Sequence, residues 1–380
     1  MSPAARVAAG AGLGALALAW AGTATVAYAT LVERGAYRLR RAEAKLLPPG
    51  AEPIRVLHLS DFHLIPWQRR KRRWVAGLAR LEPDLIVNTG DNVGHAEALP
   101  RLREMLAPFA GIPGVVVHGS NDFYGPVFKN PMSYLSRGPR VKKFAPKLDA
   151  TSMDAMLRDE LGWELIDNRA CDTVVKGTRI RWVGLGDPHI KRDDPELALA
   201  ALMRLDEGVA PDLRLGAVHA PYRRAVDVLV RHGAAMVFSG HTHGGQIAVP
   251  LFGAIVSNCD LPPAQAQGIC AWRIGPGPDL GGRDAMLGDP AEPAIDGLEE
   301  HEAREAELGG PVPVSRREAG RSRRWRRRAP WTTAEGAGSA RHEGLLNVTG
   351  GLGTSAYAPF RLASRPEATL LTLLPRDGAA

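Results

Sequence analysis

Residues 239–246 read Ser-Gly-His-Thr-His-Gly-Gly-Gln, and an apolar run, 234–238, comes directly before them. A short apolar run that stops at glycine is typical of a buried strand. His241 and His243 are two positions apart, and on an extended chain such side chains point to the same side. Imidazole is the commonest metal ligand among protein side chains. The stretch therefore predicts a buried strand that ends in a pair of metal-binding histidines.

The same arrangement recurs along the chain, where short runs rich in β-branched residues end abruptly in Asp, Asn or His. The runs and the polar residues behind them are 54–59 before Asp61 and His63, 84–88 before Asp91, 115–117 before Ser120, Asn121 and Asp122, 180–183 before Asp187 and His189, and 213–218 before His219. Helix-like stretches, among them 73–81 and 222–232, lie between several runs. This alternation predicts an α/β fold, in which ligands bind beyond the carboxyl ends of the strands.

The residue types at these strand ends suit a catalytic metal site better than a structural one. Mixed imidazole and carboxylate ligands without thiolate favour Mn, Fe, Zn or Co. Cys171, Cys259 and Cys270 show no Cys-x-x-Cys spacing, so we expect plain thiols. The net charge of +7 favours anionic partners, which include phosphates and acidic membranes.

Taken together, these motifs resemble those of the calcineurin-like metallophosphoesterases, in the same order along the chain. The matching segments are 61–63, 90–91, 119–122, His219 and 240–246, and the resemblance covers roughly residues 50–273 and 344–376. The Gly-His-Thr-His-Gly-Gly-Gln form resembles the bacterial membrane-associated branch, which includes phosphodiesterases and enzymes related to the UDP-diacylglucosamine pyrophosphatases.

The resemblance implies a four-layer α/β/β/α sandwich that carries two divalent metal ions. Carried over position by position, the implied ligands are Asp61, His63 and His243 for one metal, His219, His241 and Asn121 for the other, and Asp91 as a bridge. A hydroxide shared by the two metals would attack phosphorus, and the metals would neutralise charge on the phosphoryl oxygens.

The third motif departs from the family pattern. The family usually reads Gly-Asn-His-Asp, whereas residues 119–122 read Gly-Ser-Asn-Asp. Either Ser120 takes the ligand place and Asn121 the histidine place, or Asn121 remains the ligand and Asp122 takes the histidine place. We favour Asn121 as the ligand, because an amide oxygen is the better donor to a hard cation. The usual imidazole acid is missing in both cases, which favours an acidic leaving group and therefore a diester or pyrophosphate. His118 should face the other side of its strand and is interpreted as structural.

Two weaker features lie near these motifs. Asp187 and His189 would contact substrate or brace a metal-ligating histidine, or form an ordinary turn with a capping Asp. Five consecutive cations, 69–73, would attract anionic lipid headgroups or form a solvated helix start.

The N-terminal residues predict a membrane anchor. Residues 7–32 carry no charge and are long enough to cross a bilayer. The basic residues that follow are Arg34, Arg38, Arg40, Arg41 and Lys45. Because basic residues prefer the cytoplasmic side, a single-pass anchor with a cytoplasmic catalytic domain is expected. The alternative is a cleaved export signal, since residues 27–29 read Ala-Tyr-Ala.

Composition divides the chain into four parts. Residues 1–49 are the anchor and a Pro- and Gly-rich linker, 50–273 are the phosphoesterase domain, and 344–380 add two strands, 345–349 and 368–374, joined through glycines. Residues 274–343 are rich in Pro, Gly and charge, including an Arg-rich run, and are predicted to be a disordered insertion.

The predicted function is hydrolysis of a lipid- or nucleotide-linked phosphodiester or pyrophosphate by a membrane-tethered, two-metal enzyme. The alternatives are a nuclease of the same fold and a non-catalytic protein that binds metal or phosphate. The anchor and the lack of aromatic residues among the basic runs disfavour a nuclease, so no specific nucleic acid partner is expected.

Overall fold

The computed structural model describes residues 3–126, 146–249, 252–274, 342–354 and 359–377. Of the predicted insertion 274–343, residues 275–341 lie outside the described residues, and so does the Arg-rich run. Ile274 and residues 342–343 belong to strands of the folded domain.

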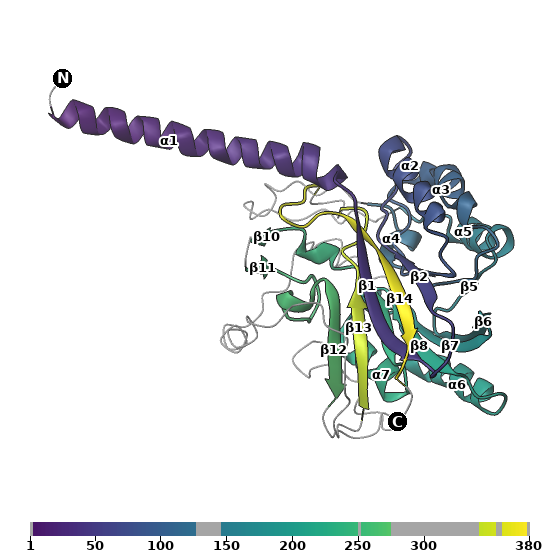
Figure 1. The fold of residues 1–380 in the computed structure, drawn as a ribbon. Helices are drawn as coiled ribbons and strands as arrows, with labels where there is room; N and C mark the ends of the chain where they lie inside the picture. Colours follow the sequence, from purple (N-terminus) through teal and green to yellow (C-terminus); the bar gives the residue numbers. More distant parts are fainter. Residues whose placement is uncertain (1–2, 127–145, 250–251, 275–341, 355–358, 378–380) are drawn as a thin grey trace.

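Two six-stranded sheets form the centre of the molecule (Figure 1). The first sheet has the order β1 (Arg38–Leu47), β14 (Glu367–Pro375), β2 (Ile54–Leu59), β3 (Leu85–Asn88), β4 (Gly114–Val116) and β5 (Trp163–Leu165). The second has the order β12 (Gly268–Ile274), β13 (His342–Val348), β9 (Met236–Ser239), β8 (Leu213–Val218), β7 (Thr178–Leu185) and β6 (Arg169–Val175). Strands β2 to β5 are mutually parallel, and so are β7, β8, β9 and β13.

Three apolar layers hold the sheets and helices together, and they confirm the four-layer prediction. The two sheets pack on each other through side chains such as Val87 and Phe238. Their sequence neighbours Ile86 and Val237 point the opposite way, because side chains alternate along a strand. The outer face of the first sheet is covered by α2 (Arg69–Gly77), α3 (Leu99–Leu106) and α5 (Ala150–Ala155), and that of the second by α7 (Arg223–Arg231) and α6 (Pro195–Asp206).

The predicted strands and helices agree with the observed ones where the apolar pattern is strong. Strands β2 and β8 have the predicted bounds, and the other predicted strands are correct to within about two or three residues. The helix predicted over 73–81 begins earlier, at Arg69, and ends in a tighter turn, Leu78–Leu81. Strands β5, β6 and β12 were not predicted, because they are short or half-exposed and lack a continuous apolar run.

Strand β1 was also not predicted, and it lies within residues 1–49, which were predicted to be only an anchor and a linker. Its residues, Arg38–Leu47, pair in parallel with β14 at the edge of the first sheet. Arg40 is buried, and its guanidinium bonds to Glu367 at 3.1 Å and to Asn347 of the second sheet at 2.8 Å. The arginines that look like a basic tail in the sequence are therefore partly used to join the two sheets.

Helix α1 (Pro3–Ala27) projects away from the body, as Figure 1 shows. Residues Gly12–Gly35 are long and apolar enough to cross a membrane, although a signal sequence meets the same criteria. A wider turn, Tyr28–Val32, continues the helix into the body. There Ala29 is buried, and its carbonyl accepts a hydrogen bond from the Arg361 backbone at 3.2 Å.

Candidate metal centre

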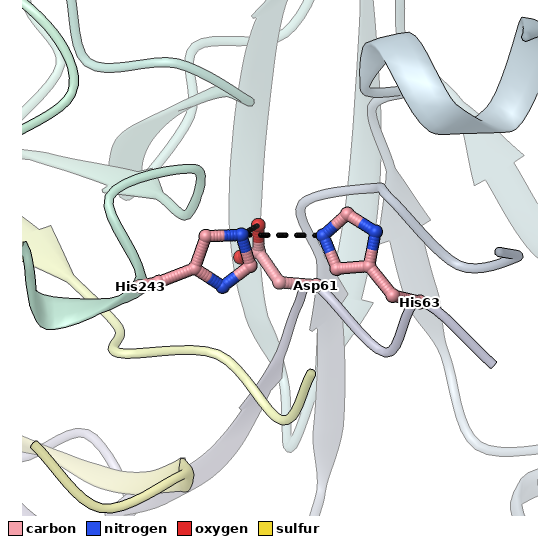
Figure 2. Close-up of side chains that lie close together, drawn as sticks. All are labelled: Asp61, His63 and His243. Carbon is pink, nitrogen blue, oxygen red and sulfur yellow. Dashed lines mark hydrogen bonds and ion pairs between the residues drawn. The ribbon is translucent and has the colours of Figure 1, made fainter. Parts of the chain in front are cut away.

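The polar strand ends of both sheets converge at one edge of the sandwich. The metal-ligating atoms of Asp61, His63 and His243 lie within 4.8 Å of one another, and those of Asp61, Asp91 and His219 form a second such group. All of these side chains are buried. Figure 2 shows the rings of His63 and His243 facing each other beside the Asp61 carboxylate; their Nε2 atoms are 3.2 Å apart.

These side chains meet through sharply turned backbone, and the alternation of side chains along an extended chain is the wrong explanation. Asp61, His63, His241 and His243 all have positive φ, between 39° and 66°. As a result, the two histidines of 239–246 diverge. His243 turns to His63, whereas the His241 ring lies 5.2 Å from that of His219. Left-handed backbone costs about 1–2 kcal/mol per non-glycine residue, which is typical of functional sites.

Asp91 is the hub of the cluster. Its Oδ2 lies 3.3 Å from His63 Nε2 and 3.5 Å from His219 Nε2. Its Oδ1 accepts a hydrogen bond from the Asn121 backbone at 2.8 Å. Burial favours protonation, but His219 and His63 outweigh it and hold the pKa of Asp91 well below its usual value.

The two ring nitrogens of His219 differ in their contacts: Nδ1 makes a backbone hydrogen bond and Nε2 makes none within the described part of the chain. Its Nδ1 donates to the carbonyl of Thr89, so Nε2, on the Asp91 side, is the nitrogen that can carry either a second proton or a metal ion. That Nε2 is buried and makes no hydrogen bond to any described residue. Burial lowers the pKa of His219, yet Asp91 and then Asp187 raise it well above its usual value. A proton on this ring therefore compensates the buried carboxylates, as a cation would.

Glycines are required where the loops approach this cluster. A Cβ on Gly119 would lie 2.2 Å from Asp91 Oδ1 and 2.7 Å from the His219 ring. A Cβ on Gly240 would lie 2.4 Å from Asp61 Oδ2. Any side chain at either position would push a candidate ligand out of place.

The third motif forms the start of α4 (Ser120–Phe123), and its residues differ in what they touch. The Asn121 side chain lies against Asp91, with 3.0 Å between Nδ2 and Oδ2, and Ser120 Oγ lies 3.3 Å from the same amide. Asp122 is fully buried and accepts hydrogen bonds from the backbone of Gly119, Asp91 and Asn92. Asp122 thus holds the loop that carries Asp91. This bracing role differs from the role at the leaving group that the sequence alternative gave to Asp122.

Asp187 and His189 lie on the side of the cluster where His219 and His241 meet. The His189 ring is 4.4 Å from that of His241, and its backbone N–H donates to Asp187 Oδ1 at 3.0 Å. Burial raises the pKa of Asp187 to about 6 against the influence of His219.

His118 lies apart from the site, bonded to Asp167 at 2.6 Å and to Asp154 at 2.8 Å, as its structural interpretation expected.

A family model for the calcineurin-like phosphoesterases matches residues 54–245, which is half of the chain and includes every residue of the cluster. The chain belongs to the calcineurin-like phosphoesterase family. It is accordingly a hydrolase that acts on phosphoester bonds. The membership accounts for the order of the motifs along the sequence.

Other proteins share parts of this phosphoesterase. The uncharacterized metallophosphoesterase YkuE of Bacillus subtilis (strain 168) is 25% identical over 224 residues, which are 57% of this chain and 67% of YkuE. Purple acid phosphatase PPD1 from yellow lupin (Lupinus luteus) seeds has 10% identity and a TM-score of 0.34; the match covers 52% of this chain and 39% of the lupin chain. TT1561 of Thermus thermophilus has 13% identity and a TM-score of 0.33; the match covers 50% of this chain and 83% of TT1561.

Arg361 is a residue of this phosphoesterase site that the sequence did not reveal. It is fully buried, and Nη1 donates to the His243 carbonyl at 3.0 Å while Nη2 donates to the Gly350 carbonyl at 2.7 Å. Its charge helps burial and His63 to lower the pKa of His243, which keeps that imidazole neutral and able to bind metal. A lone arginine in an otherwise ordinary segment gave no motif by which to find it.

Lys71 is a second buried cation that the sequence suggested would be exposed. Its Nζ donates to the carbonyl of Phe62, between Asp61 and His63 in the chain. Burial and the nearby Arg361 lower its pKa to about 7. The run 69–73 is therefore not uniformly a solvated basic face.

We predict that Arg361→Met weakens binding of Mn²⁺ by about 10- to 100-fold, the range expected when a residue behind a metal ligand is lost. The substitution keeps volume but leaves several buried carbonyls without a donor. Titration calorimetry of the metal-free protein measures the effect, and Arg365→Met, an exposed arginine four residues away, serves as the control. An unchanged dissociation constant for Arg361→Met in a folded protein would contradict this role.

We also predict that metal affinity falls as the pH is lowered through about 6. Burial raises the pKa of Asp61 to about 6 even though His219 opposes it. The pKa of His219 is also raised, chiefly by Asp91 against the effect of burial. A cation must displace these protons, so affinity should drop about tenfold per pH unit for each proton displaced. Calorimetry in buffers of different ionisation enthalpy measures the protons released. Equal affinity and no proton release at pH 5.5 and 7.5 would disprove the competition.

Proposed function

We propose that this protein is a two-metal hydrolase of a phosphodiester or pyrophosphate. The observation that carries the proposal is the position of Asp91, whose Oδ2 faces His63 on one side and His219 on the other. One carboxylate between two sets of imidazoles is the arrangement that a pair of cations requires. The donors are nitrogen and oxygen throughout, which suits Mn, Fe, Zn or Co.

The cluster divides into two ligand sets around Asp91. Asp61, His63 and His243 would hold one cation, and His219, His241 and Asn121, the last through its amide oxygen, would hold the other. Bound divalent cations would supply an activated water and neutralise charge on the phosphoryl group. The buried Nε2 of His219, which makes no hydrogen bond to a described residue, and the buried carboxylates of Asp61 and Asp91 support this fit.

The substrate class follows from the third motif. Between Gly119 and Asp122 the family carries one amide ligand and one imidazole acid. With Asn121 as the ligand, Ser120 is the residue left beside it, and a serine hydroxyl does not give up a proton readily at neutral pH. The leaving group must therefore depart with little protonation, which favours a phosphodiester or pyrophosphate over an alkyl monoester.

We further propose that α1 is retained as a single-pass membrane anchor. The small residue Ala29, at the end of the Ala-Tyr-Ala pattern, is packed against the body and bonded to Arg361. Glu33 is also buried just beyond it. A segment that is part of the folded body is a poor substrate for a signal peptidase. The basic residues after the span favour a cytoplasmic catalytic domain. The phosphoesterase domain would then begin at β1, ahead of the boundary at residue 50.

The central test is hydrolysis of bis(p-nitrophenyl) phosphate with added Mn²⁺. We expect activity that chelation abolishes, and a loss of about a hundredfold or more in kcat/KM for Asp91→Asn, since even losing a residue behind a ligand costs about 10- to 100-fold. Asp159→Asn, an exposed carboxylate on another element, is the control. A folded, metal-loaded protein without turnover would identify a non-catalytic relative, and turnover of nucleic acid alone would identify a nuclease.

A second prediction concerns the missing acid. For a series of aryl phosphodiesters, we expect the wild-type rate to fall steeply as the leaving group becomes more basic. Ser120→His should flatten this dependence because an imidazole can protonate the leaving oxygen. Ser120→Asn, which adds bulk without an acid, is the control. The same slope in Ser120→His and wild type would count against the proposed leaving-group restriction.

A further inference from the structure

A small hairpin next to the metal centre exposes apolar side chains. It consists of β10 (Ala248–Val249) and β11 (Gly253–Ala254), which pair antiparallel. Val249, Phe252 and Ile255 on and beside these strands are 42%, 65% and 54% exposed. Single exposed apolar residues are common, but three on one short hairpin indicate a contact surface.

The hairpin is tied to both the metal centre and the end of α1. It follows 239–246 directly, and the Gln246 backbone donates to the His243 carbonyl at 3.1 Å. The Ala248 backbone donates to the Leu362 carbonyl at 2.8 Å, and the neighbouring Arg361 donates to Ala29 of the anchor. Figure 1 shows β10 and β11 on the side of the body toward which α1 projects. The hairpin thus lies where a membrane crossed by α1 would meet the body.

Basic residues at the same junction match an acidic lipid surface. Arg34 follows the apolar helix and is exposed, and its guanidinium bonds to the Pro359 carbonyl at 3.4 Å. Arg70, which is also exposed, lies on α2 near Gly35. Exposed arginines at the base of an apolar helix, together with exposed apolar side chains on the same side of the body, are the composition that binds an anionic membrane interface.

We propose that the β10–β11 hairpin is a membrane-docking surface that inserts Val249, Phe252 and Ile255 into the bilayer holding α1. Docking would hold the metal centre against the headgroups, so the substrate would be a phosphodiester or pyrophosphate carried by a lipid. A lipid surface is favoured over a protein partner because residues 361–362 link the hairpin to the end of a helix that itself has the composition of a membrane span. The docking proposal rests on the proposed role of α1 as a membrane anchor. Only the substrate class rests on the proposed hydrolase activity.

The first experiment places a polarity-sensitive fluorophore at position 252. Full-length Phe252→Cys is labelled and reconstituted in vesicles of phosphatidylcholine and phosphatidylglycerol, with and without lipids that carry a quenching nitroxide. We expect a blue-shifted emission and strong quenching by the nitroxide lipids. The control is Met203→Cys, an equally exposed apolar position on α6, which should remain unquenched. Labelled wild type gives the background from the three native cysteines.

A label at Leu18→Cys on α1 shows that the protein is inserted. If that label is quenched and the label at 252 behaves like the one at 203, the hairpin does not dock and the proposal is wrong. A label at 252 that is unquenched by lipid and becomes protected only at high protein concentration would identify a second copy as the partner, which also overturns it.

The second experiment separates docking from catalysis. The triple variant Val249→Ser, Phe252→Ser and Ile255→Ser should lose about tenfold or more of its rate on a phosphodiester lipid in vesicles and keep its rate on bis(p-nitrophenyl) phosphate. The double variant Met203→Ser and Val209→Ser is the control. Equal losses on both substrates would overturn the proposal. A wild type inactive on both would refute the proposed function, whereas the quenching data would still decide the docking.

Discussion

The buried carboxylate of Asp91 is the constraint on which the site depends. A carboxylate cannot remain charged in the interior unless cations or donors surround it. His63, His219 and Asn121 supply part of that surrounding, and the depressed pKa of Asp91 shows that it stays ionised. The imidazoles are gathered around a charge that they neutralise only in part. A bound divalent cation would make up this deficit of positive charge.

Two sheets are needed to build that surrounding. Asp61, Asp91 and Asn121 follow strands of the first sheet, whereas the three histidines at 219, 241 and 243 follow strands of the second. The groups meet only because the parallel strands of both sheets end at the same edge. Arg40 of β1, which is paired with Glu367 of β14, helps to fix the alignment through its hydrogen bond to Asn347 of the second sheet. Core packing therefore sets the distances at the site, since a shift of one sheet would separate the two halves.

Arg361 connects parts of the molecule that are far apart in sequence. Its backbone bonds to Ala29 at the end of the apolar N-terminal helix, its side chain bonds to His243, and the next residue pairs with the hairpin. The end of α1 and the candidate metal centre are thus joined through one segment. The same residue helps to keep His243 neutral, so the segment has an electrostatic effect as well as a positional one.

The sequence by itself determined the fold class, the strands that end in polar residues and the family, because apolar periodicity and local motifs are written in consecutive residues. It also located most of the candidate ligands, since each follows a strand. Only the tertiary structure decided which of them meet, that Asp122 supports a loop, that β1 belongs to a sheet, and that Arg361 and Lys71 are buried beside the site. These outcomes depend on left-handed turns and on contacts between distant segments, and no local pattern encodes the burial of a charge.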